Sequence, residues 1–263
     1  MTEPAPARTP GGVRLQIDGG VATITIDRPE VRNAIGFATV EELDAAIEAV
    51  ERSDAAVLVV RGGGDRAFVS GGDLKELDAV RTFEQASDMA LRVRTVLDRL
   101  AALPVPVIAA LNGHALGGGA EVAVAADIRV AADDVRIGFT QVSLGIMPAW
   151  GGAERLVGLV GRSRALLAIA SGTQYDAAEA HRIGLVDVVV PRAGFDASWR
   201  ELAERIAALA PGTSRALKAV VAAAAPAVHE HTREQAVALF ADLWAAPAHW
   251  DAVAAVTRPR SES

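Results

Sequence analysis

The chain has 263 residues, a formal net charge of −7 and 51% hydrophobic residues, few of them aromatic. This composition predicts a globular protein with an ample core, in one large domain or in one domain with a small appendage. The negative charge argues against nucleic acid or an anionic membrane as a partner, because both attract basic proteins. The absence of cysteine excludes disulfides, thiolate catalysis and cysteine-bound metals.

The first twelve residues, MTEPAPARTPGG, are rich in proline and glycine and lack the apolar stretch of a signal peptide. We therefore expect a disordered leader over residues 1–12. The longest apolar run, AVVAAAAPAV from Ala219, is too short to span a bilayer and contains Pro226. These patterns favour a cytoplasmic protein.

Strands and helices alternate after the leader. A hairpin around Gly19 and Gly20 precedes a helix over residues 39–52, whose apolar residues recur at helical spacing. The runs AVLVVRG and PVPVIAALNG are continuous and apolar, which is typical of buried parallel strands. Further along the chain, the patterns predict the strands IRVAA, VRIGFT and LVDVVVP and the helices RALLAIASG and DAAEAHRIG. This alternation predicts an α/β fold with a mostly parallel sheet.

From Phe195 onward the pattern is helical, and prolines break it three times. We therefore divide the chain into an α/β core over residues 13–194 and a C-terminal helical region over residues 195–263. Two helices of this region, WRELAERIAAL and REQAVALFADLW, have apolar stripes. Such stripes suit either contact between subunits or packing on the helices' own domain.

Two glycine clusters follow predicted strands: RGGGDRAFVSGGDLKEL and NGHALGGGAEVAVAADI. A strand followed by glycines and a helix leaves backbone N–H groups free at the start of the helix. In the second cluster, Gly118 would lie near that start and Glu121 in the first turn. Each cluster alone reads as a tight turn, but two N–H groups that converge from separate loops can form an oxyanion hole.

Four stretches in order carry a family resemblance: DRPEVRNAI, AFVSGGDLKEL, NGHALGGGAEVAVAADIRVA and SLGIMPAWGGAERLVGLVGRSRALLAIASG. They resemble the crotonase superfamily, the enoyl-CoA hydratase/isomerase proteins, over about Val13–Pro191. The resemblance implies a crotonase-like spiral of ββα units with a C-terminal helical trimerisation region, assembled as a homotrimer or a dimer of trimers. It implies an acyl-CoA thioester substrate and no cofactor beyond the CoA moiety. We expect no metal, because the pair His229 and His231 has no third ligand spaced with it.

The resemblance assigns roles to individual residues. The N–H groups of Gly72 and Gly118 would form the oxyanion hole, and Glu121 matches one of the two glutamates of the hydratases. Gln141 replaces the second glutamate; glutamine can hold a water molecule but cannot exchange a proton, which weakens the prediction of a full-strength hydratase. The positions that match the lining of the CoA pocket are Arg32, Ala34, Ser70, Asp73 and Leu74. Asp73 equally suits a helix cap.

The reaction stays open at this point. The leading hypothesis is an acyl-CoA enzyme that stabilises a thioester enolate with a single catalytic glutamate. One alternative is a decarboxylase of ethylmalonyl-CoA or methylmalonyl-CoA, because loss of CO₂ generates the enolate without a base; Trp150 before paired glycines is similar to that branch of the family. Another alternative is a non-catalytic acyl-CoA-binding pseudo-enzyme. RNA binding ranks last because the first helix, EELDAAIEAVE, is acidic.

The protonation state of Glu121 also stays open. A helix start lowers the pKa of a carboxyl group, whereas the apolar neighbours Ala120, Val122 and Val124 predict burial, which raises it.

Overall fold

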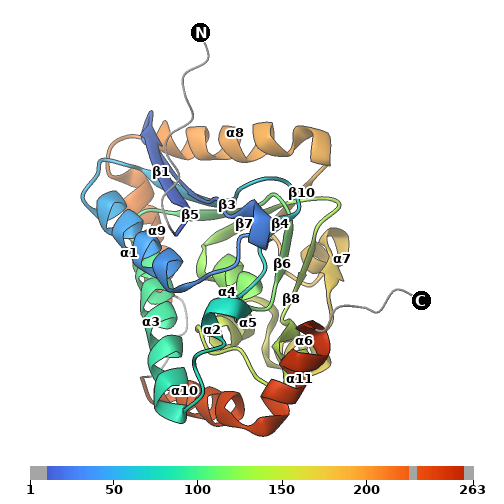
Figure 1. Ribbon diagram of the computed structural model, residues 1–263. Coiled ribbons are helices and arrows are strands. Elements are labelled where there is room, and N and C mark those ends of the chain that lie inside the picture. The colour runs from blue at the N-terminus through green and yellow to red at the C-terminus, as the bar shows by residue number, and fades with distance from the viewer. Residues whose placement is uncertain (1–10, 225–229, 258–263) are drawn as a thin grey trace.

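The larger of two sheets forms the centre of the protein (Figure 1). This computed structural model describes residues 11–224 and 230–257. The larger sheet has the strand order β1-β2-β3-β5-β7-β10, and its pairs are parallel except for β1 with β2. Its strands are β1 (Val13–Asp18), β2 (Val21–Ile26), β3 (Val57–Gly62), β5 (Val107–Leu111), β7 (Ile128–Ala132) and β10 (Val188–Val190). The predicted hairpin and the predicted parallel sheet are therefore confirmed.

A smaller sheet, in the order β4-β6-β8-β9, lies beside the first. Its strands are β4 (Ala67–Val69), β6 (His114–Leu116), β8 (Arg136–Gly138) and β9 (Tyr175–Asp176). The chain passes from the larger sheet to the smaller one three times, from β3 to β4, from β5 to β6 and from β7 to β8. A helix follows each passage, so the fold is the spiral of ββα units that the family resemblance implies.

Helices cover both sheets. They are α1 (Phe37–Glu51), α2 (Leu74–Leu77), α3 (Phe83–Ala102), α4 (Gly118–Ala125), α5 (Gly152–Val160), α6 (Arg162–Ser171), α7 (Ala177–Arg182), α8 (Phe195–Ala207), α9 (Thr213–Ala224), α10 (Glu230–Ala245) and α11 (Pro247–Thr257). Three short 3₁₀ helices are η1 (Pro29–Val31), η2 (Thr140–Leu144) and η3 (Arg192–Gly194). The long helix α3 begins at a capping box, in which Thr82 and Gln85 exchange side-chain-to-backbone hydrogen bonds.

The C-terminal helices pack on their own chain. Figure 1 shows α8 along one side of the larger sheet and α10 at the opposite end of the molecule, beside α3. The apolar stripes of the two predicted helices are buried, through Trp199 on α8 and through Phe240 and Trp244 on α10. Packing on their own domain is thus the observed role of these two stripes, and α11 contacts η2.

The described residues begin within the predicted leader. Residues 1–10 of the predicted leader lie outside the described residues, whereas Gly11 is buried and donates a hydrogen bond to the Glu42 carboxylate at 2.7 Å. In the part of the chain that the structure describes, no helix is both long and apolar enough to cross a membrane.

Candidate active site

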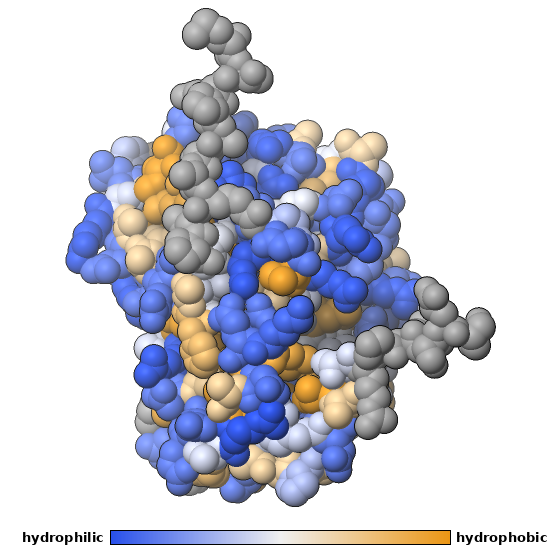
Figure 2. Space-filling view, in the orientation of Figure 1, coloured by the Kyte–Doolittle hydropathy of each residue, from blue (hydrophilic) through white to orange (hydrophobic). Residues whose placement is uncertain are grey.

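A cavity of about 110 Å³ lies where α4 begins, at the edge of the smaller sheet. Six of the predicted site residues line it: Ser70, Gly72, Leu74, Gly118, Glu121 and Gln141. Mostly apolar side chains complete its wall, among them those of Met89, Trp150, Phe240 and Trp244. On the face of the molecule shown in Figure 2, hydrophilic residues dominate, and hydrophobic ones gather in the hollow near its centre.

Pairing of the short strands brings the two glycine clusters together. Strands β4 and β6 are parallel neighbours, with Val69 opposite Ala115, so the segments that follow them leave the sheet side by side. A Cβ atom at Gly119 would lie 1.8 Å from the carbonyl oxygen of Val69, so only glycine allows α4 to start this close to the end of β4. The run of glycines therefore serves a close backbone approach between two loops.

The amides of Gly72 and Gly118 have no acceptor within the described residues. Around Gly72, the backbone N–H of Ile35 donates to Gly71 at 2.8 Å and that of Asp73 donates to Ile35 at 2.9 Å. Successive peptide groups of an extended chain point to opposite sides, so the N–H of Gly72 points away from Ile35. Gly118 is the first residue of α4, where backbone N–H groups lack an acceptor inside the helix. Two free donors thus border one cavity.

Glu121 lines this cavity from the first turn of α4 and is only 2% exposed. Its Oε2 accepts hydrogen bonds from the backbone N–H groups of Trp150 at 2.7 Å and Gly152 at 2.9 Å. Its Oε1 accepts from Nε2 of Gln141 at 2.9 Å. Gly152 begins α5, so the start of that helix, and not only that of α4, faces the carboxyl group.

Burial decides the protonation of Glu121. Loss of solvation raises the pKa of its carboxyl group from 4.5 to about 7, although the hydrogen bonds from Gly152, Trp150 and Gln141 each lower it. The acid and the carboxylate are therefore both populated near neutral pH, which suits a group that takes up and returns a proton.

Gln141 lines the cavity and has an unused hydrogen-bond acceptor. The residue belongs to η2 and is 7% exposed, and its Oε1 is buried without a hydrogen-bond partner in the described residues. Because an ionised Glu121 can only accept, the amide NH₂ group of Gln141 must face it, and this orientation leaves the carbonyl oxygen free. That oxygen is able to accept a hydrogen bond from a water molecule or a substrate.

Three predicted residues are not brought into the cavity. Arg32 is exposed, and Ala34 is buried with its carbonyl oxygen accepting from Arg28 at 2.7 Å. Asp73 accepts from the backbone N–H of Lys75 at 3.2 Å as the N-cap of α2, and it also pairs with Arg28 at 3.1 Å. The helix-cap alternative for Asp73 is thus observed, and a contact of these three residues with CoA stays a prediction.

Several lining residues escaped the sequence reasoning. Met89 comes from α3, a helix that the sequence patterns did not predict. Phe240 and Trp244 come from α10. The apolar stripe of α10 predicts that this face is buried, but it does not show which surface the face covers. The pair His229 and His231 lies outside the side chains that the structure describes.

The comparisons with known proteins agree with this geometry. The enoyl-CoA hydratase/isomerase family profile matches residues 16–250. The chain belongs to this family. A short-chain-enoyl-CoA hydratase of Clostridium acetobutylicum is 40% identical over 200 residues, which cover 76% of each sequence. A probable enoyl-CoA hydratase of Mycobacterium tuberculosis is 35% identical over 210 residues and 80% of each sequence.

Solved structures of enoyl-CoA hydratase/isomerase proteins share the fold. The crystal structure of an enoyl-CoA hydratase from Bacillus anthracis superimposes with a TM-score of 0.77 at 34% identity, over 85% of this chain and 87% of that one. An enoyl-CoA hydratase/isomerase from Xanthobacter autotrophicus gives a TM-score of 0.83 at 27% identity, over 93% of both chains. The family assignment therefore extends over the C-terminal helices as well as the α/β core.

Proposed function

We propose that this member of the enoyl-CoA hydratase/isomerase family hydrates short 2-enoyl-CoA thioesters, with Glu121 as its acid–base group. The observation that carries the proposal is the pair of free amides, of Gly72 and Gly118, at the cavity that holds Glu121. The similarity to a protein named short-chain-enoyl-CoA hydratase supports the substrate class.

The hydration proceeds through an enolate in this proposal. Water adds its oxygen to C3 of the enoyl group, the C2–C3 π electrons move toward the thioester, and negative charge develops on the thioester oxygen. The amides of Gly72 and Gly118 stabilise that charge, and losing one such donor typically costs about 3–4 kcal/mol of transition-state stabilisation. Collapse of the enolate and protonation at C2 give the 3-hydroxyacyl-CoA.

Glu121 carries both proton transfers in this scheme. Among the described residues that line the cavity, it is the side chain able to exchange a proton near neutral pH. Its carboxylate accepts the proton from water as the C3–O bond forms, and the resulting acid returns that proton to C2. Gln141 holds the water through its free Oε1 and keeps Glu121 oriented through its Nε2.

We propose that the CoA nucleotide lies outside the cavity, along the segment that carries Arg32 and Ala34. Arg32 is exposed and forms no salt bridge with another described residue, so its guanidinium is available for a phosphate group. Ser70 and Leu74 line the cavity and would contact the pantetheine arm where it enters.

Decarboxylation of a malonyl-type thioester is the second candidate. One observation favours it: a glutamine stands where a second proton-exchanging group is expected, and decarboxylation needs no base. Loss of CO₂ leaves the same enolate, which the two amides would stabilise. The cavity wall, however, contains no Lys, Arg or His among the described residues to hold the substrate carboxylate.

The experiment compares crotonyl-CoA with ethylmalonyl-CoA and methylmalonyl-CoA on wild-type protein and on Glu121→Gln. Hydration of crotonyl-CoA by the wild type, reduced about 100- to 10,000-fold by the substitution, is the expected result. Turnover of only the malonyl-type esters would show that the enzyme is a decarboxylase and not a hydratase. Tight binding of all three esters with no turnover would identify a non-catalytic acyl-CoA binder.

We further propose a homotrimer or a dimer of trimers. Helix α9 supports assembly, because Leu217, Val220 and Val221 form an apolar stripe on it and are each more than half exposed. Sedimentation velocity would then report three or six times the 27.2 kDa chain mass, whereas a monomer would contradict the proposal.

A further inference from the structure

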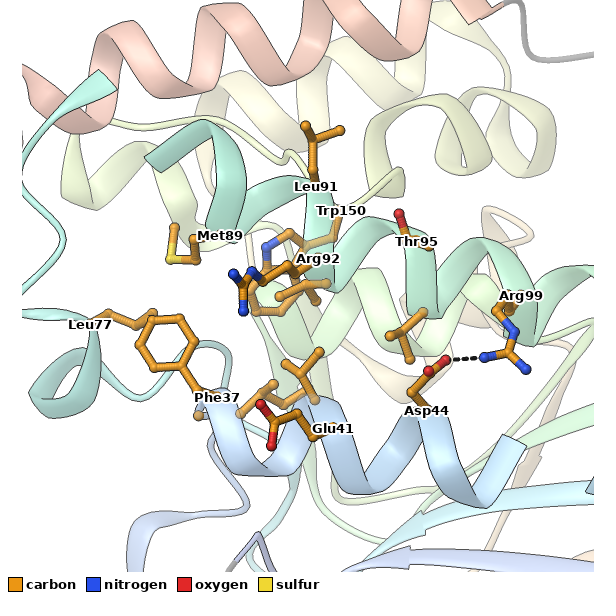
Figure 3. Close-up of a pocket in the computed structure, with 15 residues that line it drawn as sticks. Phe37, Glu41, Asp44, Leu77, Met89, Leu91, Arg92, Thr95, Arg99 and Trp150 are labelled. Carbon is orange, nitrogen blue, oxygen red and sulfur yellow. Dashed lines mark hydrogen bonds and ion pairs between the residues drawn. The ribbon is translucent and has the colours of Figure 1, made fainter. Parts of the chain in front are cut away.

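A second cavity, of about 430 Å³, adjoins the candidate active site. It forms a groove between α1 and α3, which is shown in Figure 3 with Phe37 and Glu41 on α1 and Arg92 and Thr95 on α3. Its inner wall is apolar, and its apolar lining residues are Ile35, Phe37, Val40, Leu77, Met89, Leu91, Val93, Val96 and Trp150. Charged side chains, including the ion pair of Asp44 with Arg99, lie along its rim.

Three residues line both cavities: Leu77, Met89 and Trp150. Trp150 has the largest side chain of the three, and it is 7% exposed. Its indole lies against both glycines of the candidate oxyanion hole. A Cβ atom at Gly118 would lie 2.2 Å from the ring, and one at Gly72 would lie 3.9 Å from it.

An acyl group held at the two amides would therefore meet the indole at once. We infer that Trp150 is the residue that limits the length of the acyl chain, by closing the passage from the active-site cavity into the groove between α1 and α3. The inference rests on the proposed function, since it takes an acyl-CoA thioester as the ligand. The occupant of the groove, once it is opened, is the distal part of a longer acyl chain.

The chemistry of the groove fits that occupant. Its apolar lining consists of aliphatic and aromatic side chains, and two of its charged residues, Glu41 on α1 and Arg92 on α3, are exposed to solvent. Each methylene that moves from water into such a wall strengthens binding about fourfold. In the wild-type protein the indole of Trp150 keeps the acyl chain out of the groove, so the chain does not gain this affinity.

The backbone of Trp150 has a separate task that a side-chain substitution preserves. Its N–H donates to Glu121 at 2.7 Å, and its carbonyl oxygen accepts from Arg155 at 3.0 Å. Replacing the side chain therefore removes the barrier while leaving both of these hydrogen bonds possible. This separation allows chain length and chemistry to be measured independently.

The test measures dissociation constants of butanoyl-, octanoyl- and dodecanoyl-CoA by calorimetry, for wild type, Trp150→Ala and Met89→Ala. Met89→Ala thins the same wall from α3 and keeps the test valid if Trp150→Ala does not fold. In the wild type we expect affinity to be independent of chain length. In Trp150→Ala we expect affinity to rise about fourfold per added methylene until the groove is filled. A smaller gain is expected in Met89→Ala.

Two further variants make the result specific. Val40→Phe, added to Trp150→Ala, fills the groove from α1 and is expected to remove the gain for dodecanoyl-CoA. Trp199→Ala deletes a buried indole on α8 that borders neither cavity, and it should keep the wild-type dependence on chain length. Equal chain-length dependence in wild type and in a folded Trp150→Ala variant would overturn the inference.

Saturated esters undergo no hydration, so this binding series stands apart from the proposed activity. A wild type that binds butanoyl-CoA but hydrates no enoyl-CoA would refute the function and leave the role of Trp150 to be decided by the series. Conversely, full hydratase activity with identical chain-length dependence in all variants would refute only the role of Trp150.

Discussion

At the scale of single residues, the site depends on how three donors share one carboxyl group. Glu121 is surrounded by apolar packing, yet both of its oxygens are hydrogen-bonded. Burial outweighs those bonds, and the pKa rises to about 7. A carboxylate is thus available to take a proton from water above that pH, and its acid form dominates below it.

Removing the hydrogen bond that Nε2 of Gln141 donates should favour the protonated form of Glu121 further. Because a hydrogen bond to the carboxylate favours the ionised form, Gln141→Met is expected to raise the pKa of Glu121. In wild type, kcat/KM for crotonyl-CoA should fall about tenfold per pH unit below pH 7. In Gln141→Met the same fall should begin at higher pH, and the plateau rate should also drop because the water loses its acceptor.

The measurement is the pH dependence of kcat/KM for the two proteins. Ser143→Ala serves as the control, because Ser143 is on the same 3₁₀ helix but is exposed and lies outside the cavity. In this variant, kcat/KM should begin to fall at the same pH as in the wild type. If the fall of kcat/KM in Gln141→Met begins at the same pH as in the wild type, or at a lower pH, the amide of Gln141 does not stabilise the carboxylate of Glu121.

At the scale of elements, the position of α4 against β4 brings the two glycine loops together. Gly119→Ala should force the helix and the strand apart, because the new Cβ atom would lie 1.8 Å from the carbonyl oxygen of Val69. We expect a loss of about 1–3 kcal/mol in unfolding free energy, together with a loss of hydratase activity. Urea denaturation and a rate assay at saturating substrate measure the two effects.

Gly158→Ala is the matched control for that substitution. Gly158 is an exposed residue inside α5, and a Cβ atom there would meet nothing within 4 Å. Its replacement should stabilise the protein by about 0.4–1 kcal/mol, since alanine loses less chain entropy in a helix. Equal stability losses in both variants would contradict a specific role for the contact between α4 and β4.

At the scale of the whole molecule, the sequence patterns predicted an α/β fold with a mostly parallel sheet, and the family resemblance implied the spiral of ββα units. The short strands β4 and β6 could not be predicted, because three residues are too few to show a period. The sequence also placed Glu121 correctly in the first turn of α4, but it could not reveal that two of its donors, at Trp150 and Gly152, come from the start of α5.

The walls of the cavity were the least predictable part. Met89 and Trp244 reach it from α3 and α10, helices that are far apart in the sequence and meet only through tertiary packing. A sequence pattern shows that such residues are buried, but it does not name their neighbours. The amides of Gly72 and Gly118, in contrast, were assigned through the family resemblance, because each glycine cluster alone is equally typical of a tight turn.

The central claim is that two amides from separate loops hold one acyl oxygen. A crystal structure with bound butanoyl-CoA tests this claim most directly. The thioester oxygen should lie within about 2.7–3.1 Å of the backbone nitrogens of both Gly72 and Gly118, with Cα of the acyl group facing Glu121. An oxygen beyond hydrogen-bonding distance of either nitrogen would contradict the account.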